Sequence, residues 1–114
     1  VVMVASITTG SLAALTFWLV PLVLGQPMLR LFLLAEHTGC EEVADMLRNS
    51  RTVRTNFFVR LISWNMSFHT AHHVSPATPF HQLASASQIV AERCLVVDDS
   101  YAGVHAKILS RLGK

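Results

Sequence analysis

Three of the six histidines in the chain lie within five residues, at His69, His72 and His73. On a helix, residues three and four positions apart share a face, with Cβ atoms about 5–6 Å apart. His72 and His73 are consecutive, so they diverge by about 100° around a helix axis. We therefore expect His69 and one of these neighbours to bind one metal ion, while the other neighbour turns toward a second. Neutral imidazole suits iron, copper, zinc and nickel, so the spacing indicates a transition metal without selecting one.

Other histidine chemistries fit this stretch less well. A metalloprotease helix needs a glutamate between its histidines, as in His-Glu-x-x-His, whereas Thr70 and Ala71 stand between His69 and His72. Ferritin-like di-iron bundles pair histidine with glutamates that this stretch lacks. A histidine-rich turn at a membrane surface, without any metal, stays open as the alternative.

Four further motifs surround the histidines. Residues 34–40 read LAEHTGC, residues 51–56 read RTVRTN, residues 63–66 read SWNM, and residues 76–81 read PATPFH. With the His-x-x-His-His box, this series resembles the C-terminal part of the membrane fatty acid desaturase and hydroxylase superfamily, especially its bacterial members. There the last histidine box precedes a Pro-x-x-Pro-Phe-His-like segment, and a Glu-His-Thr-Gly element supplies a further histidine. The specific motifs cover residues 21–79, and the resemblance continues more loosely to the C-terminus.

The resemblance implies an oxygen-dependent lipid desaturase with a di-iron site. In that superfamily, histidines of several boxes hold two irons at the cytosolic face, and O₂ is the co-substrate that allows hydrogen to be removed from an unactivated C–H bond. Carried over by motif, the metal ligands of this chain are His37, His69, His72 and His73. The implied partners are a lipid acyl substrate, the membrane, and an electron carrier such as ferredoxin or a haem protein.

The chain departs from the superfamily pattern in two ways. Ala71 stands where relatives often carry a glutamate, and a carboxylate near a metal-bound histidine normally orients it, so metal affinity is expected to suffer. Residues 1–36 contain no histidine, although the first two histidine boxes of the superfamily lie upstream of the last. We therefore expect the C-terminal part of a desaturase domain, inactive alone. The alternatives are a non-catalytic membrane remnant with adventitious metal binding, and a related lipid or carotenoid hydroxylase or ketolase.

The elements that position these histidines begin with an apolar segment. No charged side chain precedes Arg30, and residues 1–25 exceed the roughly 20 apolar residues that span a bilayer. A signal peptide would have a basic start and a shorter apolar core, and a buried helix of a soluble protein is the other alternative. We predict a transmembrane helix over residues 1–25, broken at Gly25 to Pro27. A shorter membrane-interface helix over residues 28–37 then delivers His37 just before Gly39, a residue type that ends helices.

The remainder reads as a water-facing helical region. Its arginines place it on the cytoplasmic side by the positive-inside rule, at a bacterial inner membrane. Helices are predicted around residues 43–48, 56–64, 81–93 and 98–112, with a turn at Pro76 and Pro79, and Asp98 or Asp99 could cap the last helix. The predicted fold class is all-α and integral to the membrane, a fragment of a larger helical membrane domain. Residues 1–114 form part of one domain, with membrane helices over 1–38 and the histidine-box region over 39–114.

Composition excludes several other classes. Hydrophobic residues make up 52% of the chain and charged residues 14%, against roughly 25% charged in soluble domains. The net charge of +2 comes without a basic run, so nucleic acid is not an expected partner. Cys40 and Cys94 show neither a C-x-x-C spacing nor a disulfide framework, which favours a reducing compartment.

Overall fold

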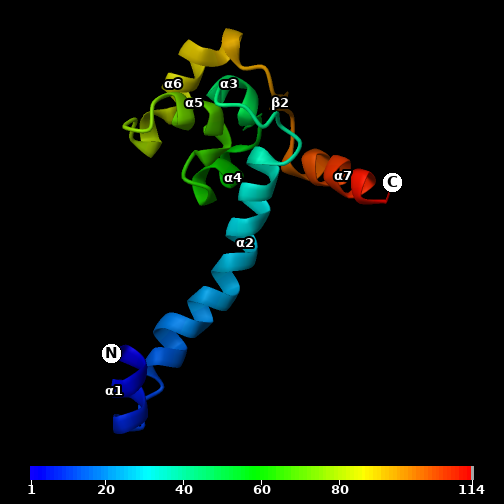
Figure 1. Cartoon of the computed structure of the whole chain (residues 1–114). Coiled ribbons are helices and arrows are strands. Elements are labelled where there is room, and N and C mark those ends of the chain that lie inside the picture. Colours follow the sequence, from blue (N-terminus) through cyan, green and yellow to red (C-terminus); the bar gives the residue numbers. More distant parts are fainter. Residues whose placement is uncertain (114) are drawn as a thin grey trace. The chain divides into compact units, whose positions relative to one another are not determined.

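The structure is a computed structural model that describes residues 1–113, and 69% of the chain is helical. The prediction of a mostly helical protein is therefore confirmed. The chain forms two compact units, one of residues 1–31 and one that begins at Phe32 (Figure 1).

The first unit contains a helix break that the sequence analysis did not predict. Helix α1 (Val2–Thr9) ends at Gly10, whose left-handed backbone (φ 65°) lets two N–H groups turn back into the helix. The N–H of Ser11 donates to the carbonyl of Ser6 at 2.9 Å, which is the pattern of a glycine helix stop. The Ser6 hydroxyl then accepts the N–H of Ala14 at 3.0 Å and holds the following turn. An uninterrupted helix over residues 1–25 is thus wrong, because Gly10 ends it.

The predicted break at Gly25 to Pro27 is also wrong. A π-helical turn, η1 (Leu15–Leu19), leads directly into helix α2 (Val20–His37), which continues through Pro27. The fixed φ of proline is compatible with a helix, and its penalty is the loss of one N–H bond and crowding of the preceding turn. Long apolar helices tolerate that local penalty because neighbouring backbone groups readjust. Residues 28–37 are consequently the end of α2 and not a separate short helix.

The continuous helical stretch Leu15–His37 is the one candidate membrane span among the described residues. It has 23 residues, a mean hydropathy of 1.7, and no part of its apolar window is buried within the chain. At 1.5 Å per residue it is about 34 Å long, enough for a hydrocarbon core of about 30 Å. Its exposure argues against a core helix of a soluble protein, since such a helix would be covered by other elements.

The second unit combines short helices with one small strand pair. Strand β1 (Thr52–Val53) pairs in parallel with β2 (Val97–Asp98), which the all-α prediction missed. A two-residue ladder between distant segments has no local sequence period, so it is visible only in three dimensions. The helices and helical turns of this unit are α3 (Met46–Asn49), α4 (Phe57–Ile62), η2 (Met66–Phe68), α5 (His69–Val74), η3 (Phe80–Gln82), α6 (Leu83–Val90), η4 (Ala91–Arg93) and α7 (Tyr101–Leu112).

The apolar core of this unit joins the end of α2 to the strand pair and the C-terminal helix. Ala35, Val53, Val104 and Ile108 are buried together, and Tyr101 packs against them. Because the cluster is small, polar groups make up much of the remaining interior, including a glutamate, an arginine and a histidine.

The cap of the last helix differs from the sequence prediction. The hydroxyl of Ser100 accepts the N–H of Gly103 at 3.1 Å and caps α7, so neither Asp98 nor Asp99 has that role. Asp98 instead belongs to β2 and forms an ion pair with the buried Arg51.

Both cysteines, Cys40 and Cys94, are free thiols.

Candidate metal centre

His37 is held at the end of α2 by a well-defined stop. Gly39 adopts φ 79°, and the predicted role of this glycine in ending the helix is confirmed. The guanidinium of Arg51 donates to the carbonyls of Ala35 and Thr38, which the end of the helix leaves unpaired. The positive charge at the helix C-terminus also suits the helix dipole.

The tautomer of His37 follows from its partner. Its Nδ1 lies 3.2 Å from the carbonyl oxygen of Asn49, and a carbonyl can only accept, so Nδ1 carries the proton and donates. The lone pair of His37 is then on Nε2. This arrangement, with one ring nitrogen donating to backbone and the other left basic, is typical of histidines that bind metals.

The other histidines are positioned by a tight turn. Trp64 (φ 54°) and Asn65 (φ 58°) both adopt left-handed backbone between α4 and η2. The Asn65 side chain donates to the carbonyl of Phe80 at 3.0 Å, and the rings of Trp64 and Phe80 lie 5.0 Å apart. Two consecutive non-glycine residues in this region cost of order 1–3 kcal/mol each, so the surrounding contacts must maintain the turn. Helix α5 starts four residues later, at His69.

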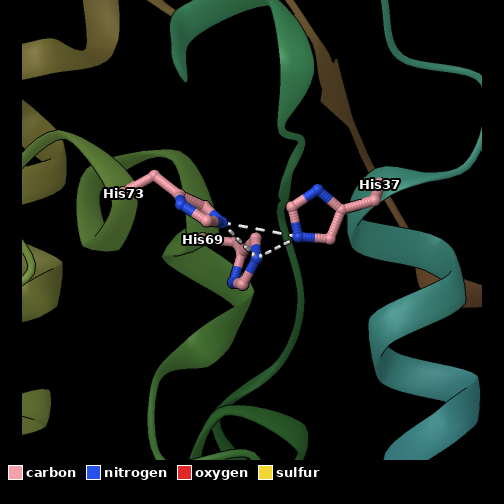
Figure 2. A group of neighbouring side chains, drawn as sticks. All are labelled: His37, His69 and His73. Atoms are coloured by element: carbon pink, nitrogen blue, oxygen red, sulfur yellow. Dashed lines mark hydrogen bonds between the residues drawn. The ribbon is translucent and has the colours of Figure 1, made fainter. Parts of the chain in front are cut away.

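Three imidazoles from these two segments converge on one point (Figure 2). Nε2 of His69 lies 2.8 Å from Nε2 of His37 and 3.0 Å from Nε2 of His73, and the third separation is 3.4 Å. Two nitrogens bound to one ion at about 2.1 Å are about 3.0 Å apart at a right angle and about 3.4 Å apart at the tetrahedral angle. The three nitrogens therefore have the spacing of ligands to a single transition-metal ion.

His72 does not join this group. The ligand atoms that lie within 4.8 Å of one another belong to His37, His69 and His73. The His72 ring centroid is 5.9 Å from that of His69, and its Nδ1 is buried without a partner among residues 1–113. The two consecutive histidines therefore lie differently: His73 is beside His69, and His72 is outside the group.

The remaining histidines are outside the group. His81 is exposed on η3 beside Phe80, and His105 lies on α7. In the described part of the chain, no other cluster of three metal-ligating side chains occurs.

Electrostatics favour the neutral, metal-binding form of the histidines. Burial, followed by the charges of His73, His37 and His72, lowers the pKa of His69 to about 3. Burial and the neighbouring histidines also lower the pKa of His73. Three basic nitrogens that face one another repel unless a cation or proton lies among them, so the cluster is suited to a cation.

Sequence reasoning missed a carboxylate beside the cluster. Glu36 is 2% exposed, and its Oε2 lies 3.4 Å from Nδ1 of His69. Its Oε1 accepts a hydrogen bond of 3.2 Å from the hydroxyl of Tyr101. Burial and then Glu36 raise the pKa of this hydroxyl above its usual range, so it keeps its proton. The sequence signal was available, because Glu36 is the only acidic residue before Glu41 and follows a run of apolar side chains.

An open cleft of about 600 Å³ lies beside His37. Its lining includes Thr38, Glu41, Glu42 and Asn49. Cys40 and Val43 also line it, so the lining is mixed in polarity.

Comparison with known proteins identifies a family. The family model described as "Fatty acid desaturase" matches residues 1–104. No match to a curated protein or to a solved structure was found. Family membership indicates an oxidoreductase that acts on lipid and associates with a membrane, and iron is the metal that the family generally uses. Because the match covers nearly the whole sequence, this chain belongs to the fatty acid desaturase family.

Proposed function

We propose that this chain supplies the last histidine box of an oxygen-dependent, di-iron desaturase that acts on acyl lipids. In this proposal His37, His69 and His73 bind one iron, and His72 turns toward a second. The observation that carries the proposal is the convergence of three Nε2 atoms, from helices α2 and α5, at separations of 2.8–3.4 Å.

The residues present fit a metal for a second reason, which is proton placement. His37 donates Nδ1–H to a backbone carbonyl, which leaves Nε2 basic and aimed at the other two rings. The low pKa of His69 keeps that ring neutral at physiological pH. When bound, iron would supply the activation of O₂ that lets hydrogen leave an unactivated C–H bond. The protein would hold the imidazoles in place and limit access of water to the buried His69.

The position of the site in the chain supports a membrane-bound substrate. His37 is the last residue of the 23-residue apolar stretch, so the histidine cluster would lie where the membrane helix meets water. We propose that residues 1–38 are the membrane part and residues 39–114 the cytoplasmic part, at a bacterial inner membrane. The arginines after His37 favour that orientation. Electrons would come from a separate carrier such as ferredoxin or a haem protein.

The ligand count sets a limit on the activity of the chain alone. Four histidines are too few for two irons, so we expect no desaturation by this chain by itself. The test is mass spectrometry of membrane lipids after expression, with ferredoxin and its reductase supplied. A desaturated product formed by the chain alone would contradict the ligand-count argument.

The metal assignment is tested by measuring iron bound per chain in detergent under anaerobic conditions. We expect His37→Ala, His69→Ala and His73→Ala each to reduce iron binding strongly. His81→Ala and His105→Ala are matched controls outside the cluster and should leave it unchanged. Equal iron content in all five variants would refute the assignment. His72→Ala should leave the first iron in place, because its ring lies outside the converging group.

A further inference from the structure

The buried carboxylate of Glu36 lies between the histidine cluster and the C-terminal helix. One of its oxygens is 3.4 Å from Nδ1 of His69, and the other accepts the hydroxyl of Tyr101 at 3.2 Å. These contacts join the end of α2, helix α5 and helix α7. Nothing in the histidine spacing predicts them.

Metal binding makes a definite demand on His69. If Nε2 binds the ion, the proton must reside on Nδ1, which then becomes a buried donor. In the described residues Nδ1 of His69 has no hydrogen-bond partner, and an oxygen of Glu36 lies 3.4 Å from it. A buried donor left without an acceptor is costly, so a small closure of this gap would stabilise the metal-binding tautomer.

Glu36 in turn needs something to hold it, since a buried carboxylate is stable only when it is paired or hydrogen-bonded. Tyr101 meets that need. Its ring packs edge-on against Phe32 at 4.9 Å and against the apolar core, so the position of its hydroxyl is fixed.

We infer that Glu36 is the positioning residue for His69, and that Tyr101 makes the C-terminal helix α7 part of the metal centre. This inference rests on the proposed metal site. Ala71, which is 1% exposed, offers no carboxylate beside the histidines. In this chain the carboxylate beside the cluster comes from the end of α2 instead. The weakened metal affinity expected from Ala71 is thereby offset.

The test measures Zn²⁺ affinity, by competition with a chelator, for the whole chain in detergent micelles. Removing a group that orients a metal-bound histidine typically lowers metal affinity 10–100-fold, and we expect that loss for Glu36→Gln. Tyr101→Phe keeps the ring and removes one hydrogen bond, so a loss of about two- to tenfold is expected. Glu92→Gln changes an exposed glutamate outside the cluster and should have no effect. The double variant should bind no more weakly than Glu36→Gln, because Tyr101 acts through Glu36.

A second readout separates positioning from general support of the fold. Nitrogen-15 NMR of the zinc-loaded chain should show His69 protonated at Nδ1 and metal-bound at Nε2. In Glu36→Gln the His69 ring should populate both tautomers. His37 should keep one tautomer, because its Nδ1 donates to a backbone carbonyl. If Glu36→Gln loses its helical circular dichroism, the Zn²⁺ affinity of Tyr101→Phe tests the inference instead, because this variant keeps the aromatic ring in the core.

The outcomes distinguish this inference from the proposed function. If the wild-type chain binds no Zn²⁺, or binds it equally well after His69→Ala, the metal site itself is refuted. If His69 is needed but Glu36→Gln binds within twofold of wild type, the site stands and the role of Glu36 is refuted. Additive losses in the double variant would overturn the role of Tyr101.

Discussion

Replacing Arg51 with methionine should remove a buried guanidinium that holds the end of α2 against β2. Its Nε lies 2.9 Å from Oδ2 of Asp98, with side-chain exposures of 8% and 14%. Its Nη1 donates to the carbonyls of Ala35 and Thr38. Hydrogen bonds from charged donors contribute about 1.5–3 kcal/mol each, and breaking a buried pair by removing one partner costs about 3–5 kcal/mol. Asp98 keeps Lys107 as a partner, so we expect Arg51→Met to lower the free energy of unfolding by about 3 kcal/mol, the lower end of that range.

Arg48 provides the matched control. It pairs with Glu41 at 2.6 Å, but the two side chains are 45% and 55% exposed. Exposed ion pairs contribute little to stability, so Arg48→Met should lower the free energy of unfolding much less than Arg51→Met does. Urea unfolding followed by circular dichroism in non-ionic detergent gives both values. The loss of unfolding free energy in Arg51→Lys should lie between those of Arg51→Met and Arg48→Met, because lysine keeps the positive charge without the planar guanidinium.

The same variant should also weaken the metal centre. The carbonyls that Arg51 binds flank Glu36 and His37, so the end of α2 loses its fixed position when the guanidinium is removed. We expect Arg51→Met to lower Zn²⁺ affinity while Arg48→Met does not. Equal unfolding free energies for the two variants would refute the conclusion that Arg51 organises this part of the fold.

Three further predictions concern the turn, the pH dependence and the membrane. Asn65→Ala should lower the free energy of unfolding by about 1–2 kcal/mol, because it loses the hydrogen bond to Phe80 and keeps a left-handed backbone. Asn65→Gly loses the same bond but relieves the backbone, so it should be less destabilising. Equal urea midpoints for the two variants would contradict this. The pKa of His69 is lowered from 6.5 to about 3, so the folded state takes up its proton less readily than the unfolded state. The stability that neutral His69 gives the metal-free chain is fully present above about pH 6.5 and is lost as pH falls toward 3. In His69→Gln the free energy of unfolding, measured at several pH values, should therefore depend less on pH over this range. The chain should stay with membranes after carbonate extraction, and recovery as a folded, soluble monomer would refute a membrane span.

Local sequence determined the chemistry-bearing residues and the overall helical character. The spacing of His69, His72 and His73 is a property of helix geometry, so it indicated that one neighbour accompanies His69 before any tertiary contact was known. Gly39 could be predicted as a helix stop because a left-handed C-terminal residue is a local preference. The apolar N-terminal part could likewise be predicted as a membrane helix from composition, but its limits could not.

Two sites near the N-terminus could interrupt the helix, and the local sequence did not show which of them does. Gly25 and Pro27 looked like the stronger interruption, yet the helix continues through them and breaks at Gly10 instead. At Gly10 the left-handed backbone returns N–H groups to the helix, and Ser6 bonds the next turn. The break is favoured because its backbone groups have partners on both sides.

Only the tertiary structure decided which side chains face the histidines. The choice of His73 over His72 depends on where α2 ends relative to α5, and the spacing alone allowed either. The partnership of Glu36 with His69 and Tyr101 joins residues that are 33 and 65 positions from it along the chain. Such contacts leave no periodic trace in the sequence, because they arise from the packing of α7 and the strand pair against the end of α2. The sequence therefore determined which histidines this chain can offer, and the packing decided which of them meet and which carboxylate lies beside them.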